Sequence, residues 1–510
     1  MTDTIDALLR LRAEQEPDKI AIVDPDQRLS YRELDATTTD LATALVSLGV
    51  TKGTRVGLVM PNSVPWVQIA LAVTRIGAVL VPLSTLLAPA ELTAQLKVAS
   101  VQVLIAVEEF RGHRYLDHLP RRQDPSLPAL RQILAPGQLG ADPDRRTREL
   151  VAAMGAAVTP SDLLLIMFTS GSSGIPKGVM HSHGNALGAV RASLAPRCID
   201  SDTRLYLPMP FFWVGGFGAG VLSVLLAGAT LVTEPAPQPA TTLALLEREG
   251  VTLFRGWPDQ AETLARQRDS IGADLSALRP GSLEALLPPG LRSRPGARAN
   301  LFGMTESFGP YCGYPADTDM PESAWGSCGR PFDGMDVRIV DPDTGAPLPE
   351  GQTGMIQIRG PHILRGICRR SREEVFTPDG YYPTGDQGRL DEQGFLFYHG
   401  RCDNMFKVSG ATVYPSEVQR ALRSIDGVRA AFVTNVSGPQ GNRVGAAVVT
   451  TTGPQQLRAA AKGILSSFKV PTVWLVLDDD AAIPRGATGK VDTTALREML
   501  YQTTRFKEKI

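Results

Sequence analysis

Cysteine is scarce in this chain of 510 residues: there are five, widely separated and odd in number. They form no C-x-x-C pair, so a disulfide framework and structural zinc are disfavoured and a reducing, cytoplasmic setting is expected. An excess of one charge is also lacking, because the formal net charge is −1. We therefore do not expect nucleic acid or an anionic membrane surface as the main partner. The acidic N-terminus predicts no secretory signal.

Long hydrophobic runs are rare, and one segment, Leu205 to Thr233, carries no charge. Its part from Phe211 to Thr233 is long enough to cross a bilayer. The segment begins with Pro208 and Pro210 and contains five glycines. It also lacks the basic flanks and the aromatic belt of a membrane span. We expect a strand end, a glycine-rich bend and a buried core helix, and no integral membrane span.

The expected fold class is α/β, with two to four domains for this length. Up to residue 110, apolar strands alternate with helices, which predicts parallel sheets covered on both faces. Ser30 and Glu33 form a capping box that opens one of these helices. Residues 111–148 are interpreted as a surface connection. A β-rich subdomain is expected at about 330–400, within an N-terminal domain of residues 1–400, and a small α+β domain at 401–510.

The most informative stretch is an apolar run, Leu163 to Phe168, followed by small residues and Lys177. Small residues let a backbone turn tightly and present N–H groups and hydroxyls to an anion, and a lysine adds a positive charge. Most Gly/Ser runs are flexible linkers, but the strand before this one and Pro176 after it are atypical of a linker. The spacing also differs from G-x-x-x-x-G-K-[ST]. We therefore predict a phosphate-binding loop at Thr169, Ser170, Gly171, Ser172, Ser173 and Gly174.

Four further motifs follow in order: Phe302-Gly-Met-Thr-Glu306, Tyr382-Pro-Thr-Gly-Asp386, the segment Gly400 to Gly410, and Ile483-Pro-Arg-Gly-Ala-Thr-Gly-Lys490. Taken singly, they could be a surface Thr-Glu pair, a turn, an interdomain linker and a solvated lysine. Together with the phosphate loop they resemble the adenylate-forming superfamily of acyl-CoA and aryl-CoA synthetases, firefly luciferase and amino-acid adenylation domains. The resemblance covers essentially the whole chain.

The resemblance implies an ATP site to which several of these motifs contribute. Phe302 would stack on the adenine, Asp386 would hold the ribose hydroxyls, and Glu306 with Thr169 would hold Mg²⁺. Lys490, Thr305 and Glu306 would be catalytic. The implied ATP-binding residues outside the loop are Lys177, Phe302, Gly303, Met304, Thr305, Asp386, Arg401 and Lys490.

The resemblance also implies a mobile C-terminal domain that rotates about a hinge at Asp403 for the second half-reaction. Lys407, Ser409 and Gly410 would then face coenzyme A. The implied acid pocket comprises Trp213, Val214, Gly216 and Phe217.

Two departures from the family pattern affect this pocket. Trp213 stands where a histidine is frequent, and the stretch from Arg279 to Ala299 is shortened. The pocket motif carries no charge, which argues against an amino-acid substrate. His181 and His183 are expected to be structural.

The predicted function is an ATP-dependent carboxylic acid–CoA ligase. A fatty or aromatic acid would be activated as acyl-AMP and then transferred to coenzyme A, with Mg²⁺ as the metal. An enzyme that loads the phosphopantetheine of a carrier protein is one alternative, and a non-catalytic binding protein is another. A serine hydrolase is disfavoured because the sequence has no G-x-S-x-G elbow.

Overall fold

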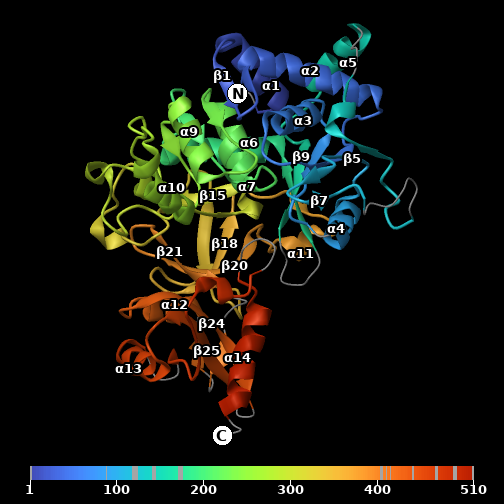
Figure 1. Ribbon diagram of the computed structural model, residues 1–510. Coiled ribbons are helices and arrows are strands. Elements are labelled where there is room, and N and C mark those ends of the chain that lie inside the picture. Colours follow the sequence, from blue (N-terminus) through green and yellow to red (C-terminus); the bar gives the residue numbers. More distant parts are fainter. Residues whose placement is uncertain are drawn as a thin grey trace. The chain divides into compact units, whose positions relative to one another are not determined.

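The computed structural model describes residues 3–87, 89–117, 125–140, 145–169, 176–401, 406–408, 411–413, 415–438, 441–465, 469–485 and 491–507. The chain divides into two compact units (Figure 1). The first unit comprises Met1–Val337, Ile358–Tyr382 and Gly394–Leu396, and the second comprises Arg338–Gln357, Pro383–Gln393 and Phe397–Ile510.

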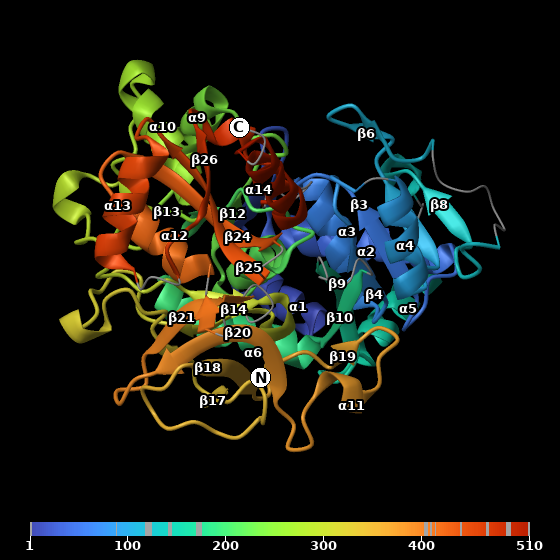
Figure 2. The same ribbon diagram turned by 90° about the horizontal axis from the view of Figure 1, so that it is seen from below.

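A seven-stranded mixed sheet in the first unit has the order β19-β10-β9-β4-β3-β5-β8 (Figure 2). The strands from β9 to β8 are parallel, whereas β10 is antiparallel to β9 and β19 is antiparallel to β10. Strands β4 and β5 are buried along their whole length, as expected for central parallel strands. The bounds are β3 Arg55–Val59, β4 Val79–Pro82, β5 Val103–Ala106, β8 Gln132–Leu134, β9 Leu163–Thr169, β10 Lys177–Ser182 and β19 Gly366–Ile367.

A five-stranded sheet in the same unit has the order β13-β11-β12-β1-β2, with β2 as its antiparallel edge. Its strands are β1 Ile20–Val23, β2 Arg28–Ser30, β11 Arg204–Tyr206, β12 Thr230–Val232 and β13 Leu253–Phe254. A small antiparallel sheet is formed by β14 Phe302–Met304, β15 Gly309–Gly313 and β16 Arg330–Pro331. Strands β6 Glu109–Phe110 and β7 His113–Arg114 form a hairpin.

Helices cover these sheets, and α1, α2 and α5 lie side by side (Figure 1). The capping box is confirmed, because Ser30 and Glu33 make both reciprocal contacts at the start of α2. The helices are α1 Ile5–Gln15, α2 Tyr31–Ser47, α3 Val64–Arg75, α4 Pro89–Ala99, α5 Arg145–Ala156, α6 His183–Leu194, α7 Val214–Gly216, α8 Ser223–Ala227, α9 Pro239–Arg248, α10 Pro258–Ile271 and α11 Arg372–Val375, with a π-helix at Phe217–Leu222.

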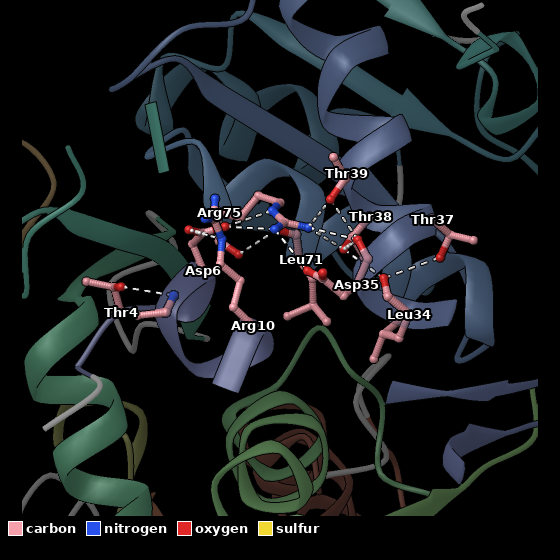
Figure 3. A network of polar contacts seen from close by, with 12 residues as sticks. Thr4, Asp6, Arg10, Leu34, Asp35, Thr37, Thr38, Thr39, Leu71 and Arg75 are labelled. Carbon is pink, nitrogen blue, oxygen red and sulfur yellow. Dashed lines mark hydrogen bonds and ion pairs between the residues drawn. The ribbon is translucent and has the colours of Figure 1, made fainter. Parts of the chain in front are cut away.

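A buried polar network joins the first three helices (Figure 3). Arg75, at the end of α3, is 2% exposed. Its guanidinium donates to Asp6 of α1 at 2.8 Å and to Asp35 of α2 at 3.0 Å. The hydroxyls of Thr38 and Thr39 accept two further bonds at 2.8 and 2.9 Å. A buried arginine is tolerated here because carboxylates and hydroxyls compensate its loss of hydration.

A four-stranded sheet of order β17-β18-β20-β21 lies mostly in the second unit. Its strands are β17 Asp336–Val340, β18 Gly354–Arg359, β20 Tyr382–Leu390 and β21 Leu396–Arg401. They are followed by the pair β22 Phe406–Val408 and β23 Ala411–Val413.

The C-terminal part of the second unit is a three-stranded sheet with helices on both faces. Helices α12 and α13 pack on one face through Val418 and Leu457, and α14 packs on the other through Leu496 and Leu500. The bounds are α12 Pro415–Arg423, β24 Val428–Gly438, β25 Gly441–Thr450, α13 Pro454–Ile464, β26 Val473–Leu477 and α14 Thr493–Lys507.

Two sequence interpretations can be judged here. The surface connection expected at 111–148 is wrong in part, because β8 extends the large sheet beside β5 and α5 begins at Arg145. The segment Leu205 to Thr233 is interrupted as predicted, although its helical part includes a π-helix that was not foreseen. Within the described residues, no helix is long and apolar enough to cross a membrane.

Candidate active site

The phosphate-loop motif lies at the connection between two paired strands. Strand β9 ends at Thr169 and β10 begins at Lys177, and these two residues are direct partners in the antiparallel ladder. The predicted loop residues Ser170, Gly171, Ser172, Ser173 and Gly174 lie outside the described residues. The ladder therefore fixes the two ends of the motif, and Lys177 is held by the strand.

Two side chains from distant segments of the first unit, Glu306 and Tyr382, meet Lys177. Its ammonium donates to the carboxylate of Glu306 and, at 2.6 Å, to the hydroxyl of Tyr382. The Tyr382 hydroxyl lies 3.1 Å from Glu306 Oε1 and donates to it. The side chains of Lys177 and Glu306 are 19% and 5% exposed. The predicted phosphate cation and the predicted metal carboxylate, 129 residues apart in sequence, thus form one partly buried ion pair.

The local backbone explains how Glu306 reaches this cluster. Strand β14 ends at Met304, and a 3₁₀ turn, Thr305–Ser307, follows it. A side chain at Gly303 would collide with the carbonyl of Gly309 on the neighbouring strand, so only glycine allows β14 and β15 to approach this closely. Phe302 packs edge-on against Tyr311, with ring centroids 5.5 Å apart. Sequence reasoning quoted Tyr382 as part of a motif and missed its contact with Lys177.

In the second unit, β20 and β21 bring together two of the predicted nucleotide-binding residues. Arg401 Nη1 lies 3.4 Å from Asp386 Oδ1 and donates to the carbonyl of Thr384 at 3.1 Å. Gly385 has a φ of 71°, and a Cβ there would lie 3.0 Å from Arg401 Nη2. Glycine therefore supplies both the left-handed conformation and the space for the guanidinium. The Asp386 side chain is 8% exposed and that of Arg401 is 41% exposed.

The predicted acid-pocket motif forms α7 and the π-helix that follows it. Trp213 meets Trp257 edge-on, with ring centroids 6.4 Å apart. Phe217 is fully buried and packs against Trp66 at 5.7 Å, so its side chain belongs to the core of the first unit. A Cβ at Gly216 would lie 2.1 Å from the carbonyl oxygen of Pro210, which explains the glycine. Val214 is half-buried beside this core.

Comparison with known families tests the resemblance inferred from these motifs. Residues 9–368 match the AMP-binding enzyme family. The chain belongs to the AMP-binding enzyme family.

Members of this family resemble the chain over nearly its whole length. A 3-[(3aS,4S,7aS)-7a-methyl-1,5-dioxo-octahydro-1H-inden-4-yl]propanoyl:CoA ligase of Mycobacterium tuberculosis is 32% identical, over 97% of this chain and 99% of the relative. A feruloyl-CoA synthase of Amycolatopsis is 31% identical over 94% and 96%. The solved structure of an ATP-bound RpMatB-BxBclM chimera is 26% identical and covers 98% and 99% of the two chains, with a TM-score of 0.80.

These matches confirm the resemblance inferred from the motifs, and they confirm the α/β fold class. They also confirm that the chain belongs to a class of enzymes. The assigned roles of individual residues stay predictions.

Five of the predicted positions in the C-terminal segment cannot be placed in full. Asp403, Ser409, Gly410 and Lys490 lie outside the described residues. Lys407 is placed in β22 by its backbone, and its side chain lies outside the described part. The hinge, the coenzyme A face and the catalytic lysine therefore remain predictions from the motifs.

The residues present fit the magnesium ion that was predicted from the sequence. Glu306 offers a carboxylate oxygen, the ligand type that Mg²⁺ prefers, at the cluster with Lys177. The described residues contain no group of three or more His, Cys, Asp or Glu side chains able to hold a metal. Mg²⁺ is commonly bound by one or two carboxylates together with substrate phosphates. Thr169, the other predicted ligand, ends β9 opposite Lys177.

Proposed function

We propose that this protein is an ATP-dependent carboxylic acid–CoA ligase that forms an acyl-AMP intermediate. The observation that carries the proposal is the convergence of Lys177 and Glu306 on one partly buried cluster. A cation from the phosphate-loop motif and a carboxylate from the second motif suit the phosphates of ATP and their metal. The named relatives are CoA ligases, which supports coenzyme A as the acceptor.

The chemistry requires such a charged site, because a carboxylate is a poor electrophile. Its oxygen attacks the α-phosphate of ATP, an acyl–phosphate bond forms, and the bond to pyrophosphate breaks. Negative charge accumulates on the phosphates in the transition state, and fixed cations and dipoles lower its free energy. Mg²⁺, when bound, would contribute positive charge beside these phosphates. The thiol of coenzyme A then attacks the acyl carbon and AMP leaves.

Each residue has a distinct part in this proposal. Lys177 would exchange its contact with Glu306 for phosphate oxygens, and Glu306 would then be available as the metal ligand. Lys490 would bridge the substrate carboxylate and the α-phosphate. Asp386 and Arg401, which lie together in the second unit, would hold the ribose and the nucleotide.

The acid is proposed to be fatty or aromatic. Trp213 and Trp257 form an edge-to-face pair, and the segment from Phe211 to Thr233 carries no charge. Both features favour an apolar acyl group. The two relatives named above are named for ring-bearing acids, which supports an aromatic or alicyclic substrate, whereas a further relative from Rattus norvegicus is named a medium-chain acyl-CoA ligase, which supports a fatty acid.

Pyrophosphate release with a panel of acids tests the proposal. The panel comprises fatty acids of increasing length, benzoate, cinnamate-type acids and alicyclic propanoates. We expect release with at least one acid, loss of release in Glu306→Gln, and normal release in Glu350→Gln, which changes an exposed glutamate. No release with any acid, under conditions in which ATP binds, would exclude the ligase.

A second arm of the experiment identifies the acceptor. The acyl-AMP formed with the best acid is offered to coenzyme A and, separately, to a phosphopantetheine-bearing carrier protein. Thioester formation with coenzyme A supports the proposal. Thioester formation with the carrier protein alone would replace it by the carrier-loading alternative.

A further inference from the structure

His181 lies on β10, four residues beyond Lys177, and contacts the turn that carries Glu306. Residues 177, 179 and 181 line one face of β10 because side chains alternate along a strand. The His181 side chain is completely buried. Its sequence context predicted only a structural residue, yet both of its ring nitrogens have defined partners.

The hydrogen bonds around Asn185 determine which ring nitrogen of His181 carries the proton. The Ser182 backbone N–H donates to Asn185 Oδ1 at 2.6 Å, so this end of the amide is the oxygen. The other end, Nδ2, donates to His181 Nδ1 at 2.8 Å and to the His362 carbonyl at 3.1 Å. His181 Nδ1 is therefore an acceptor, and the proton of the neutral ring is on Nε2.

The Nε2–H group of His181 donates to the carbonyl of Thr305 at 2.8 Å. This carbonyl belongs to the peptide immediately before Glu306. On the other side of that residue, the carbonyl of Glu306 accepts from the backbone N–H of Leu364 at 2.7 Å. The two peptides that flank the Glu306 side chain are thus both anchored to neighbouring segments.

Aromatic packing restricts the same turn further. Phe308 lies edge-on to the His181 ring, with ring centroids 4.8 Å apart, and it is 2% exposed. Its φ is 51°, a conformation that a phenylalanine adopts only when its surroundings hold it. A Cβ at Gly218, in the π-helix, would lie 3.1 Å from the Phe308 ring. His181 and the π-helix therefore confine Phe308 from two sides.

We propose that His181 is a positioning residue of the active site, which fixes the Thr305–Glu306 turn so that the Glu306 carboxylate meets Lys177 and the metal–nucleotide complex. The proposal deepens the proposed function and rests on it. His181 stays neutral while it does this, because burial lowers its pKa to about 3. Its single N–H is consequently directed at Thr305 over the whole physiological range of pH.

Two substitutions separate positioning from simple core filling. His181→Gln keeps a side-chain N–H that can reach the Thr305 carbonyl, whereas His181→Leu fills similar space without a donor. We expect Leu to raise the Kd of Mg·ATP at least tenfold and Gln to restore it to within threefold of the wild-type value. Wild-type affinity in the Leu variant, or equal losses in both variants, would overturn the proposal.

His183 provides the matched control. It is equally buried, two residues along the chain, and its Nδ1 accepts from the backbone of Ile5 at 3.3 Å, in α1. We expect His183→Leu to lower the melting temperature while the Kd of Mg·ATP stays within twofold. An increase in Kd as large as that of His181→Leu would mean that any buried histidine in this layer has the same effect, which contradicts a specific role.

A measurement on the wild-type protein covers the case in which the variants do not fold. Nitrogen-15 NMR of labelled histidines should show His181 as the Nε2–H tautomer, without titration between pH 5 and pH 8. An Nδ1–H tautomer or a titration in that interval would overturn the proposal. Nucleotide affinity and this spectrum are both independent of pyrophosphate release, so failure of the proposed function would be recognised separately.

Discussion

Replacing Lys177 by methionine removes the cation from a carboxylate that is 5% exposed. Removing one partner of a buried ion pair costs about 3–5 kcal/mol, since the remaining charge is left without compensation. Lys177 is itself about one-fifth exposed, and Tyr382 still donates to Glu306. We therefore expect a loss near the lower limit, about 3 kcal/mol.

The double variant Lys177→Met/Glu306→Gln separates this structural cost from the cost to nucleotide binding. With both charges removed, the free energy of unfolding should return close to the wild-type value, because a neutral pair needs no compensation. Nucleotide affinity should stay low. A hydrogen bond to a charged group contributes about 1.5–3 kcal/mol, which corresponds to a rise of about 10- to 150-fold in the Kd of Mg·ATP.

Thermal unfolding and titration calorimetry with Mg·ATP measure the two quantities on the same samples. Lys97→Met, which changes an exposed lysine of α4, serves as the control and should alter neither quantity. The reasoning would be refuted by a double variant that binds Mg·ATP within threefold of wild type. A Lys177→Met single variant with wild-type thermal stability would refute the structural half.

Three further predictions concern other parts of the chain. Lys490→Ala should slow acyl-AMP formation by at least about 10²–10³-fold and largely spare thioester formation from preformed acyl-AMP, as measured by the two half-reactions; equal loss in both would contradict the role. Gly155→Ala should lower the free energy of unfolding by about 1–3 kcal/mol in urea titrations, because the new Cβ would lie 2.6 Å from Asp6 Oδ2 in the Arg75 network. Burial lowers the pKa of His183 from 6.5 to about 4, so the unfolded chain binds more protons than the native one as pH falls below 6.5, and stability should decrease. Between pH 7.5 and 5.5 this group should account for about 1.4 kcal/mol, and His183→Leu should show a shallower pH dependence by that amount.

Sequence pattern predicted the C-terminal elements well. Within the α+β domain expected at 401–510, the apolar pattern predicts a helix at Pro415–Arg423 and a strand at Val473–Leu477, and the structure has both elements with these bounds. The helix has a clear helical period because it buries one face on the sheet, whereas the strand is a continuous apolar run because helices cover both faces of that sheet. Strand β8 was missed since three half-buried edge residues between prolines give no such period.

The motifs located the residues of the candidate site, but the contacts between them could not be derived from sequence. The bond between Lys177 and Glu306 depends on how β10 and the turn after β14 are brought together by the fold of the first unit. His181 was expected to be structural because it lies outside the motifs that carry the family resemblance. A signal was nonetheless present: His181 lies four residues beyond Lys177, and this spacing places both on the same face of a strand.

The direct pairing of Thr169 with Lys177 has a consequence for engineering this enzyme. The two ends of the phosphate-loop segment lie directly opposite each other in the ladder, so a replacement segment of another length could be grafted between them while Lys177 keeps its place. A slip of β10 by a single residue would act differently, because it would turn Lys177 and His181 together to the opposite face of the sheet. Loop length and strand alignment are therefore separate design variables, and only the second one controls the direction in which the lysine points.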